Sequence, residues 1–205
     1  MALAHFITHP EVTIDPAIPV PDWTLSPRGL ARMRAMLAEP WVASIGAVFS
    51  STERKALDGA AILATDRGLS VQEYVALGEN DRSATGYLPK EEFERTADAF
   101  FAQSAVSIRG WERAIDSQAR IVAAMEVVFG LAPPGQDIAI IAHGGVGALY
   151  LCHLWARPIS RAADQPANGG GNRFVLNTID RHPSDEYGPW GWQPIGLAGD
   201  GLPGD

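Results

Sequence analysis

Two short apolar runs, each closed by a histidine, constrain the fold of this 205-residue chain more than any other feature. Residues 138–142 are all apolar and lead into His143, which two glycines follow; near the start, residues 5–8 lead into His9 and Pro10. Short apolar runs bounded by glycine or proline are typical of buried strands. Ligands gather at the carboxyl ends of strands in open α/β sheets, so we expect His9 and His143 to share one sheet edge.

Strand-like and helix-like segments alternate along the chain. The apolar pattern predicts strands at 5–8, 45–49, 138–142 and 173–179, with a short extended piece near 71–76. It predicts helices from residue 27, from the hydroxyls at 50–52 to about 67, and over 91–103, 111–129 and 146–155. This alternation indicates a three-layer α/β/α sandwich with a mostly parallel sheet. We expect one domain over residues 1–205, with a loose tail after about residue 197.

Charge and composition exclude several classes of protein. The formal net charge is −8 and no run of lysine or arginine is present, so a nucleic-acid partner is not expected. No apolar run approaches eighteen residues and no leader is visible, so we expect no membrane segment and a cytoplasmic protein. The single cysteine, Cys152, lies in an apolar stretch and is predicted to be a small buried side chain.

Five segments, in the correct order, resemble motifs of the histidine phosphatase (phosphoglycerate mutase-like) superfamily. They are Thr8-His9-Pro10 at the position of Arg-His-Gly, Leu25-Ser26 with Gly29, Ser50-Ser51 through Arg54 to Ala56, Leu77-Gly78-Glu79, and Ala142-His143-Gly144-Gly145-Val146. The resemblance runs from His5 to about Leu154. Each segment alone is a weak signal, but together they predict a phosphoglycerate mutase-like fold.

The resemblance implies a phosphatase that hydrolyses a small phosphomonoester through a phosphohistidine on His9. Arg54 and His143 would hold the phosphate oxygens, with Thr8 and the amide of Gly144 nearby. Glu79 would protonate the leaving group if its surroundings raise its pKa. This scheme needs no metal and no cofactor, and its partner is a small phosphorylated substrate. The resemblance leaves the oligomeric state open.

One departure from the family pattern bears on activity. Thr8 stands where the family has arginine, and Pro10 where it has glycine. A charged hydrogen bond contributes about 1.5–3 kcal/mol and a neutral one about 1 kcal/mol, so turnover should be slow unless Arg82 or Arg28 supplies the charge. Thr8→Arg should raise turnover if there is room for it. The alternative function is a catalytically weakened member that binds a phosphorylated ligand or partner.

Other interpretations of these residues compete with the family assignment. The pocket is the favoured position for Arg54, with a solvated helix residue beside Glu53 and Asp58 as the alternative, and Glu79 lies in a polar stretch typical of an exposed loop. Gly145 and Gly147 after a strand resemble a dinucleotide-binding turn, but Tyr150 stands at the third glycine. A metal pair of His5 and His9 lacks further ligands nearby, so no metal site is predicted.

Overall fold

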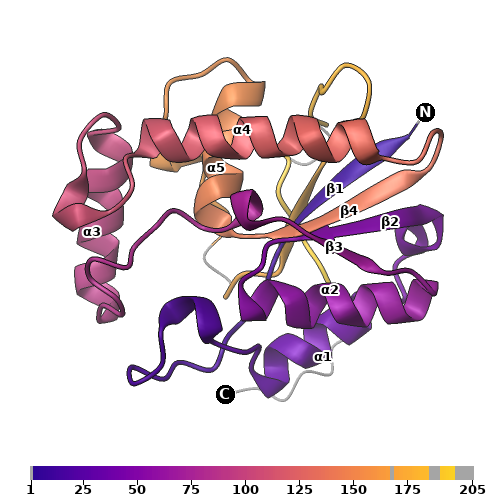
Figure 1. Ribbon diagram of the computed structural model, residues 1–205, viewed down its shortest axis with the longest axis horizontal. Helices are drawn as coiled ribbons and strands as arrows, with labels where there is room; N and C mark the ends of the chain where they lie inside the picture. Colours follow the sequence, from indigo (N-terminus) through magenta and orange to yellow (C-terminus); the bar gives the residue numbers. More distant parts are fainter. Residues whose placement is uncertain (1, 167–168, 185–189, 197–205) are drawn as a thin grey trace.

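The computed structural model describes residues 2–166, 169–184 and 190–196, and their centre is a six-stranded sheet in the order β3-β2-β4-β1-β5-β6. The strands are β1 (Leu3–Thr8), β2 (Ile45–Ser50), β3 (Val71–Glu73), β4 (Asp137–Ala142), β5 (Asn172–Asn177) and β6 (Gln193–Pro194). Strands β1 to β4 run parallel, whereas β5 and β6 are antiparallel to their neighbours. The predicted mostly parallel sheet is confirmed (Figure 1).

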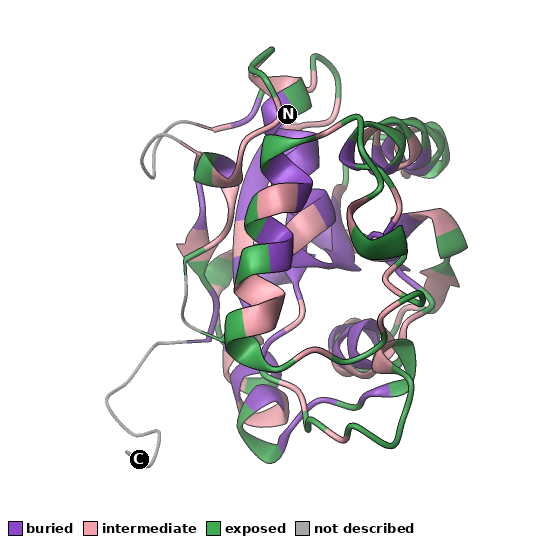
Figure 2. Ribbon diagram, turned by 90° about the vertical axis from the view of Figure 1, so that its left-hand side faces the viewer, coloured by how far each residue is buried: buried purple, intermediate pink, exposed green. Residues whose placement is uncertain are grey.

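Helices cover both faces of the sheet (Figure 1). They are α1 (Pro27–Met36), α2 (Arg54–Arg67), α3 (Lys90–Ala102), α4 (Ala114–Leu131) and α5 (Gly144–Leu154). Side chains alternate across a strand, so Ile7 and Ile141 pack with α1 and α2, while Phe6 and Ile140 pack with α4 and α5. Buried residues accordingly gather on the strands and on the inner sides of the helices (Figure 2). The three-layer α/β/α sandwich is confirmed.

Several element boundaries differ from the prediction by two or three residues, and two of these differences, at β5 and α5, have a local cause near the site. Strand β5 ends at Asn177, whose side-chain oxygen accepts a hydrogen bond from the Ile179 amide at 2.7 Å and turns the chain. Helix α5 begins at Gly144, two residues earlier than predicted, so His143 is its N-cap residue. His143 therefore lies between the last residue of β4 and the first backbone amides of α5.

Adjacent parallel strands deliver their carboxyl ends to one edge. The amide of His9 donates to the carbonyl of Ala142 at 3.1 Å, and the amide of Ser51 donates to the carbonyl of Ile141 at 3.0 Å. The residues that follow β1, β2 and β4 are thereby held side by side.

The structure also bears on predictions about residues outside the sheet. Cys152 is buried, as predicted, and its thiol donates to the carbonyl of Ser160. None of the described helices combines the length and apolar character needed to cross a membrane. The expected loose tail after residue 197 lies outside the described residues.

Candidate active site

His9 and His143 lie together at the carboxyl edge of the sheet. Their ring centroids are 5.2 Å apart and their planes meet at 68°. His143 is fully buried, whereas His9 is partly exposed. The structure therefore brings together the two residues that close the predicted strands, with His9 reachable from solvent.

A backbone carbonyl fixes the proton on the His9 ring. Nδ1 of His9 lies 2.8 Å from the carbonyl oxygen of Pro10, which can only accept, so Nδ1 carries the hydrogen. Burial and the nearby His143 and Lys55 lower the pKa of His9 to about 3, so the ring is neutral at pH 7. A neutral ring protonated on Nδ1 has a free lone pair on Nε2, which is the state a nitrogen nucleophile requires.

The ring of His143 is held by Ser51 and Glu53. Its Nε2 lies 2.8 Å from Oγ of Ser51 and 3.3 Å from Oε1 of Glu53. A carboxylate can only accept, so this contact favours a proton on Nε2. Burial lowers the pKa of His143, although the charges of Glu53 and Glu79 act in the opposite direction.

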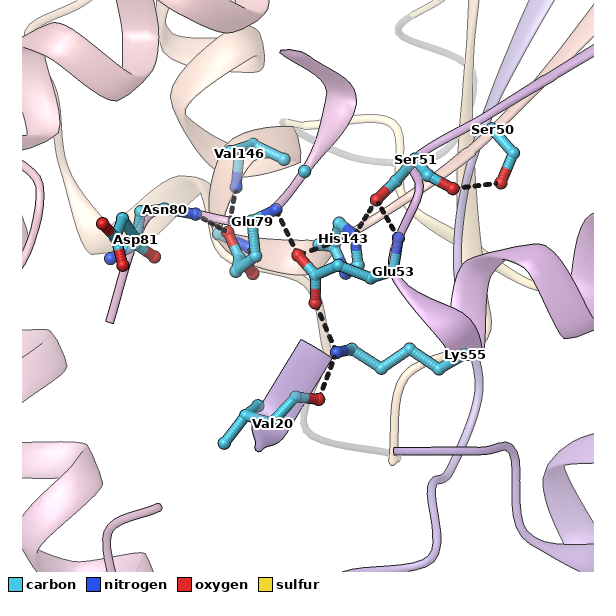
Figure 3. A network of polar contacts seen from close by, with 12 residues as sticks. Val20, Ser50, Ser51, Glu53, Lys55, Glu79, Asn80, Asp81, His143 and Val146 are labelled. Atoms are coloured by element: carbon cyan, nitrogen blue, oxygen red, sulfur yellow. Dashed lines mark hydrogen bonds and ion pairs between the residues drawn. The ribbon is translucent and has the colours of Figure 1, made fainter. Parts of the chain in front are cut away.

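Three donors converge on the carboxylate of Glu53 (Figure 3). Besides His143, Oε1 accepts from the backbone amide of Glu79 at 2.8 Å, and Oε2 forms an ion pair with Lys55. Burial acts to raise the pKa of Glu53, but His143, Lys55 and the amide outweigh it and lower that pKa to about 2. Glu53 is therefore ionised at neutral pH.

Glu79 caps the first turn of α5. Its carboxylate accepts hydrogen bonds from the amides of Gly145 and Val146, each at 3.0 Å, and pairs with Arg82 at 3.1 Å. Burial acts to raise the pKa of Glu79, but Arg82, His143 and the Gly145 amide outweigh it, and the pKa lies below its ordinary value. The raised pKa that a resting general acid requires is not found in this structure.

The structure does not bring Arg54 to this cluster. Arg54 is the first residue of α2, its side chain is 61% exposed, and its Nε donates to Asp58 one turn along at 2.7 Å. Its neighbour Lys55 is buried instead, and Nζ donates to Glu53 and to the carbonyl of Val20 at 2.9 Å. The structure therefore places Arg54 at the surface, as in the less favoured of the two interpretations of the sequence, and not in the predicted pocket.

Thr8 is fully enclosed and holds a loop rather than facing the cluster. Its hydroxyl donates to Oε1 of Gln165 at 2.6 Å and accepts from the amide of Asn172 at 3.0 Å. Gln165 in turn lies against Gly144: a Cβ at Gly144 would be 2.3 Å from Nε2 of Gln165. The side-chain amide of Gln165 thus fills the space beyond Thr8. A guanidinium at position 8 has no room in this arrangement, so the gain in turnover predicted for Thr8→Arg is no longer expected.

The two cations suggested as replacements for the missing arginine differ in position. Arg82 pairs with Glu79 and lies over the rings of Phe93 and Trp111, at 5.0 and 5.1 Å from their centroids. Arg28 is exposed on α1. Arg82 is therefore at the cluster, already paired with a carboxylate.

Sequence reasoning missed Lys55, Glu53 and Gln165. One signal for Lys55 was present, because the family segment pairs its cation directly with alanine and Lys55 is the residue that precedes Ala56. Glu53 and Gln165 carried no signal in a single sequence. In the described part of the chain, no group of three or more histidine, cysteine, aspartate or glutamate side chains is arranged to hold a metal ion.

Comparison with protein families gives one match, to the histidine phosphatase superfamily (branch 1), over residues 15–177. This span is most of the chain, and the protein therefore belongs to that superfamily. The matched span begins after His9, so the first histidine and β1 lie outside it. Membership supports a phosphatase, and hence a hydrolase. A search of curated proteins gives no significant match.

Solved structures with this fold include several phosphatases. A mycobacterial glucosyl-3-phosphoglycerate phosphatase with inorganic phosphate aligns with a TM-score of 0.71 at 19% identity, covering 90% of this chain and 95% of its own. YhfR of Bacillus stearothermophilus gives 0.73 at 17% identity, over 90% and 95%. An Entamoeba histolytica phosphoserine phosphatase in complex with 3-phosphoglyceric acid gives 0.66 at 17% identity, over 90% and 94%. At these identities the likeness shows the fold.

Proposed function

We propose that the protein is a phosphatase that hydrolyses a small phosphomonoester through a phosphohistidine on His9. The observation that carries this proposal is the state of His9: a neutral ring with its proton on Nδ1 and its Nε2 lone pair free, beside a second buried histidine. The family supports phosphoryl chemistry. Two of the fold neighbours, a glucosyl-3-phosphoglycerate phosphatase and a phosphoserine phosphatase, are named for small phosphate esters.

In the first step Nε2 of His9 attacks phosphorus, the P–N bond forms and the P–O bond to the leaving group breaks. Lys55 and His143 are the proposed donors to the phosphoryl oxygens, because both lie at the cluster and Arg54 does not. The leaving oxygen takes a proton from Glu79. Arrival of a phosphate anion opposes the effect of Arg82 and raises the pKa of Glu79, so Glu79 takes up a proton from solvent as the substrate binds and can then donate it.

In the second step water attacks phosphorus, the P–N bond breaks and His9 is released neutral. Glu79, which is ionised after the first step, accepts the proton of the water and becomes neutral. When phosphate leaves, Glu79 loses this proton to solvent and returns to the ionised state that the structure favours. The ion pair with Arg82 and the two amides of α5 stabilise this base form.

Steady-state hydrolysis of p-nitrophenyl phosphate tests the proposal. His9→Ala should abolish turnover, whereas His153→Ala, which removes an exposed histidine on α5, should leave it within about twofold. Full activity in His9→Ala would overturn the mechanism.

The second candidate function is binding of a phosphorylated ligand without turnover. Two observations favour it: Thr8 brings no charge to the cluster, and the carboxylates of Glu53 and Glu79 already pair with Lys55 and Arg82. This alternative predicts no turnover in the wild-type protein and phosphate-ester affinity that survives His9→Ala.

A further inference from the structure

The carboxylate of Glu53 occupies the donors that a phosphoryl group would use. Its two oxygens accept from Lys55, from the backbone amide of Glu79 and from Nε2 of His143 (Figure 3). A carboxylate and a phosphate present the same kind of acceptor to such donors. The side chain of Glu53 is 13% exposed and that of Lys55 is 6% exposed, so the pair is largely shielded from solvent.

The charges at the cluster are already balanced within the described residues. Lys55 pairs with Glu53, and Arg82 pairs with Glu79. His9 and His143 both have lowered pKa values and add no fixed positive charge. A phosphate that enters the cluster therefore encounters two cations that are each already paired with a carboxylate.

We propose that Glu53 is an affinity-determining residue, an internal anion that competes with the phosphoryl group for Lys55 and His143. This inference rests on the proposed function in taking Lys55 and His143 as the phosphate donors. Because phosphate and the Glu53 carboxylate compete for the same donors, phosphate binding weakens the Glu53 contacts by the same factor by which those contacts weaken phosphate binding. Removing the charge of Glu53 frees both donors and removes a like charge beside the ligand.

Binding of inorganic phosphate, measured by isothermal titration calorimetry at fixed ionic strength, tests this proposal. Glu53→Gln should bind phosphate more tightly than the wild-type protein, by a factor of roughly 5–150, the usual range for a coupling between two sites. The matched control is Glu126→Gln, which removes the same charge from an exposed pair with Arg181 and should leave the affinity unchanged.

A second variant and a second readout protect the test against poor folding. Glu53→Leu removes the charge with a side chain of similar size. Phosphate that binds the folded state raises the melting temperature, and this rise should be larger in either Glu53 variant than in the wild-type protein. Affinity that is unchanged or weaker in both variants, or equally tightened in Glu126→Gln, would overturn the proposal.

The outcomes separate this inference from the proposed function. Tighter phosphate binding in the Glu53 variants of a protein without turnover would support the inference and refute the phosphatase. Normal turnover with no gain in phosphate affinity would support the phosphatase and refute the inference.

Discussion

Thr8→Val tests whether the Thr8 hydroxyl stabilises the protein by holding Gln165 and Asn172 beside the two histidines. The hydroxyl is fully buried, donates to Gln165 at 2.6 Å and accepts from the Asn172 amide at 3.0 Å. Valine has the same shape but forms neither bond, so no cavity contributes to the effect.

The expected loss follows from the two contacts. Each hydrogen bond contributes about 1 kcal/mol, and a buried amide that loses its acceptor costs a further 1 kcal/mol or more, so we expect a loss of about 2–3 kcal/mol. In a chain of this size that corresponds to a decrease of about 4–12 °C in melting temperature.

Urea unfolding followed by far-UV circular dichroism measures this loss. Thr65→Val is the matched control, because Thr65 is exposed on α2 and the same substitution there should change stability by less than about 0.5 kcal/mol. A Thr8→Val protein as stable as the control would refute the anchoring role. Thr8→Arg should lose more stability than Thr8→Val, because the enclosed site has no room for a guanidinium.

Three further predictions concern the cations, the acid and the effect of pH. Lys55→Met should lower turnover by roughly 10²–10³-fold, whereas Arg54→Met should leave it within about twofold; equal losses in kinetic assays would contradict the assignment. Glu79→Gln should slow hydrolysis of an alkyl phosphate by roughly 10²–10⁴-fold and of p-nitrophenyl phosphate by less, because nitrophenolate needs no proton; equal slowing would argue against an acid role. Burial and a nearby arginine lower the pKa of His5 to about 4, so the stability due to the neutral ring is complete above pH 6.5 and is lost as the pH falls from 6.5 towards 4. His5→Phe keeps the stacking on Trp41 and should flatten that part of the curve in urea titrations; an unchanged slope would refute this origin.

The fold and the meeting of the two histidines could be predicted from the sequence, because both depend on local signals. The apolar runs before His9 and His143 mark buried parallel strands, and the glycines after His143 mark the turn into a helix. The carboxyl ends of adjacent parallel strands lie at the same edge of the sheet, so the residues that end such strands are neighbours whatever the conformation of the loops.

The electrostatics of the site could not be predicted in the same way. Whether Arg54 or Lys55 faces inward depends on the rotation of the first turn of α2 about the helix axis. Because the two residues are adjacent and both are cationic, the sequence does not indicate which one faces inward. The lowered pKa of Glu79 arises from Arg82, His143 and the Gly145 amide, and the loop between residues 78 and 89 carries both Glu79 and Arg82 to this place. Contacts across such loops leave no periodic signal in one sequence.

Trapping the phosphorylated protein tests the proposed phosphohistidine on His9 directly. The enzyme is mixed with a good phosphomonoester substrate, quenched in alkali, where phosphohistidine is stable, and digested for mass spectrometry. The phosphohistidine mechanism predicts a phosphate on His9 that acid removes, and that is absent from His9→Ala. Steady turnover with no acid-labile adduct on His9, or an adduct that persists in His9→Ala, would contradict it.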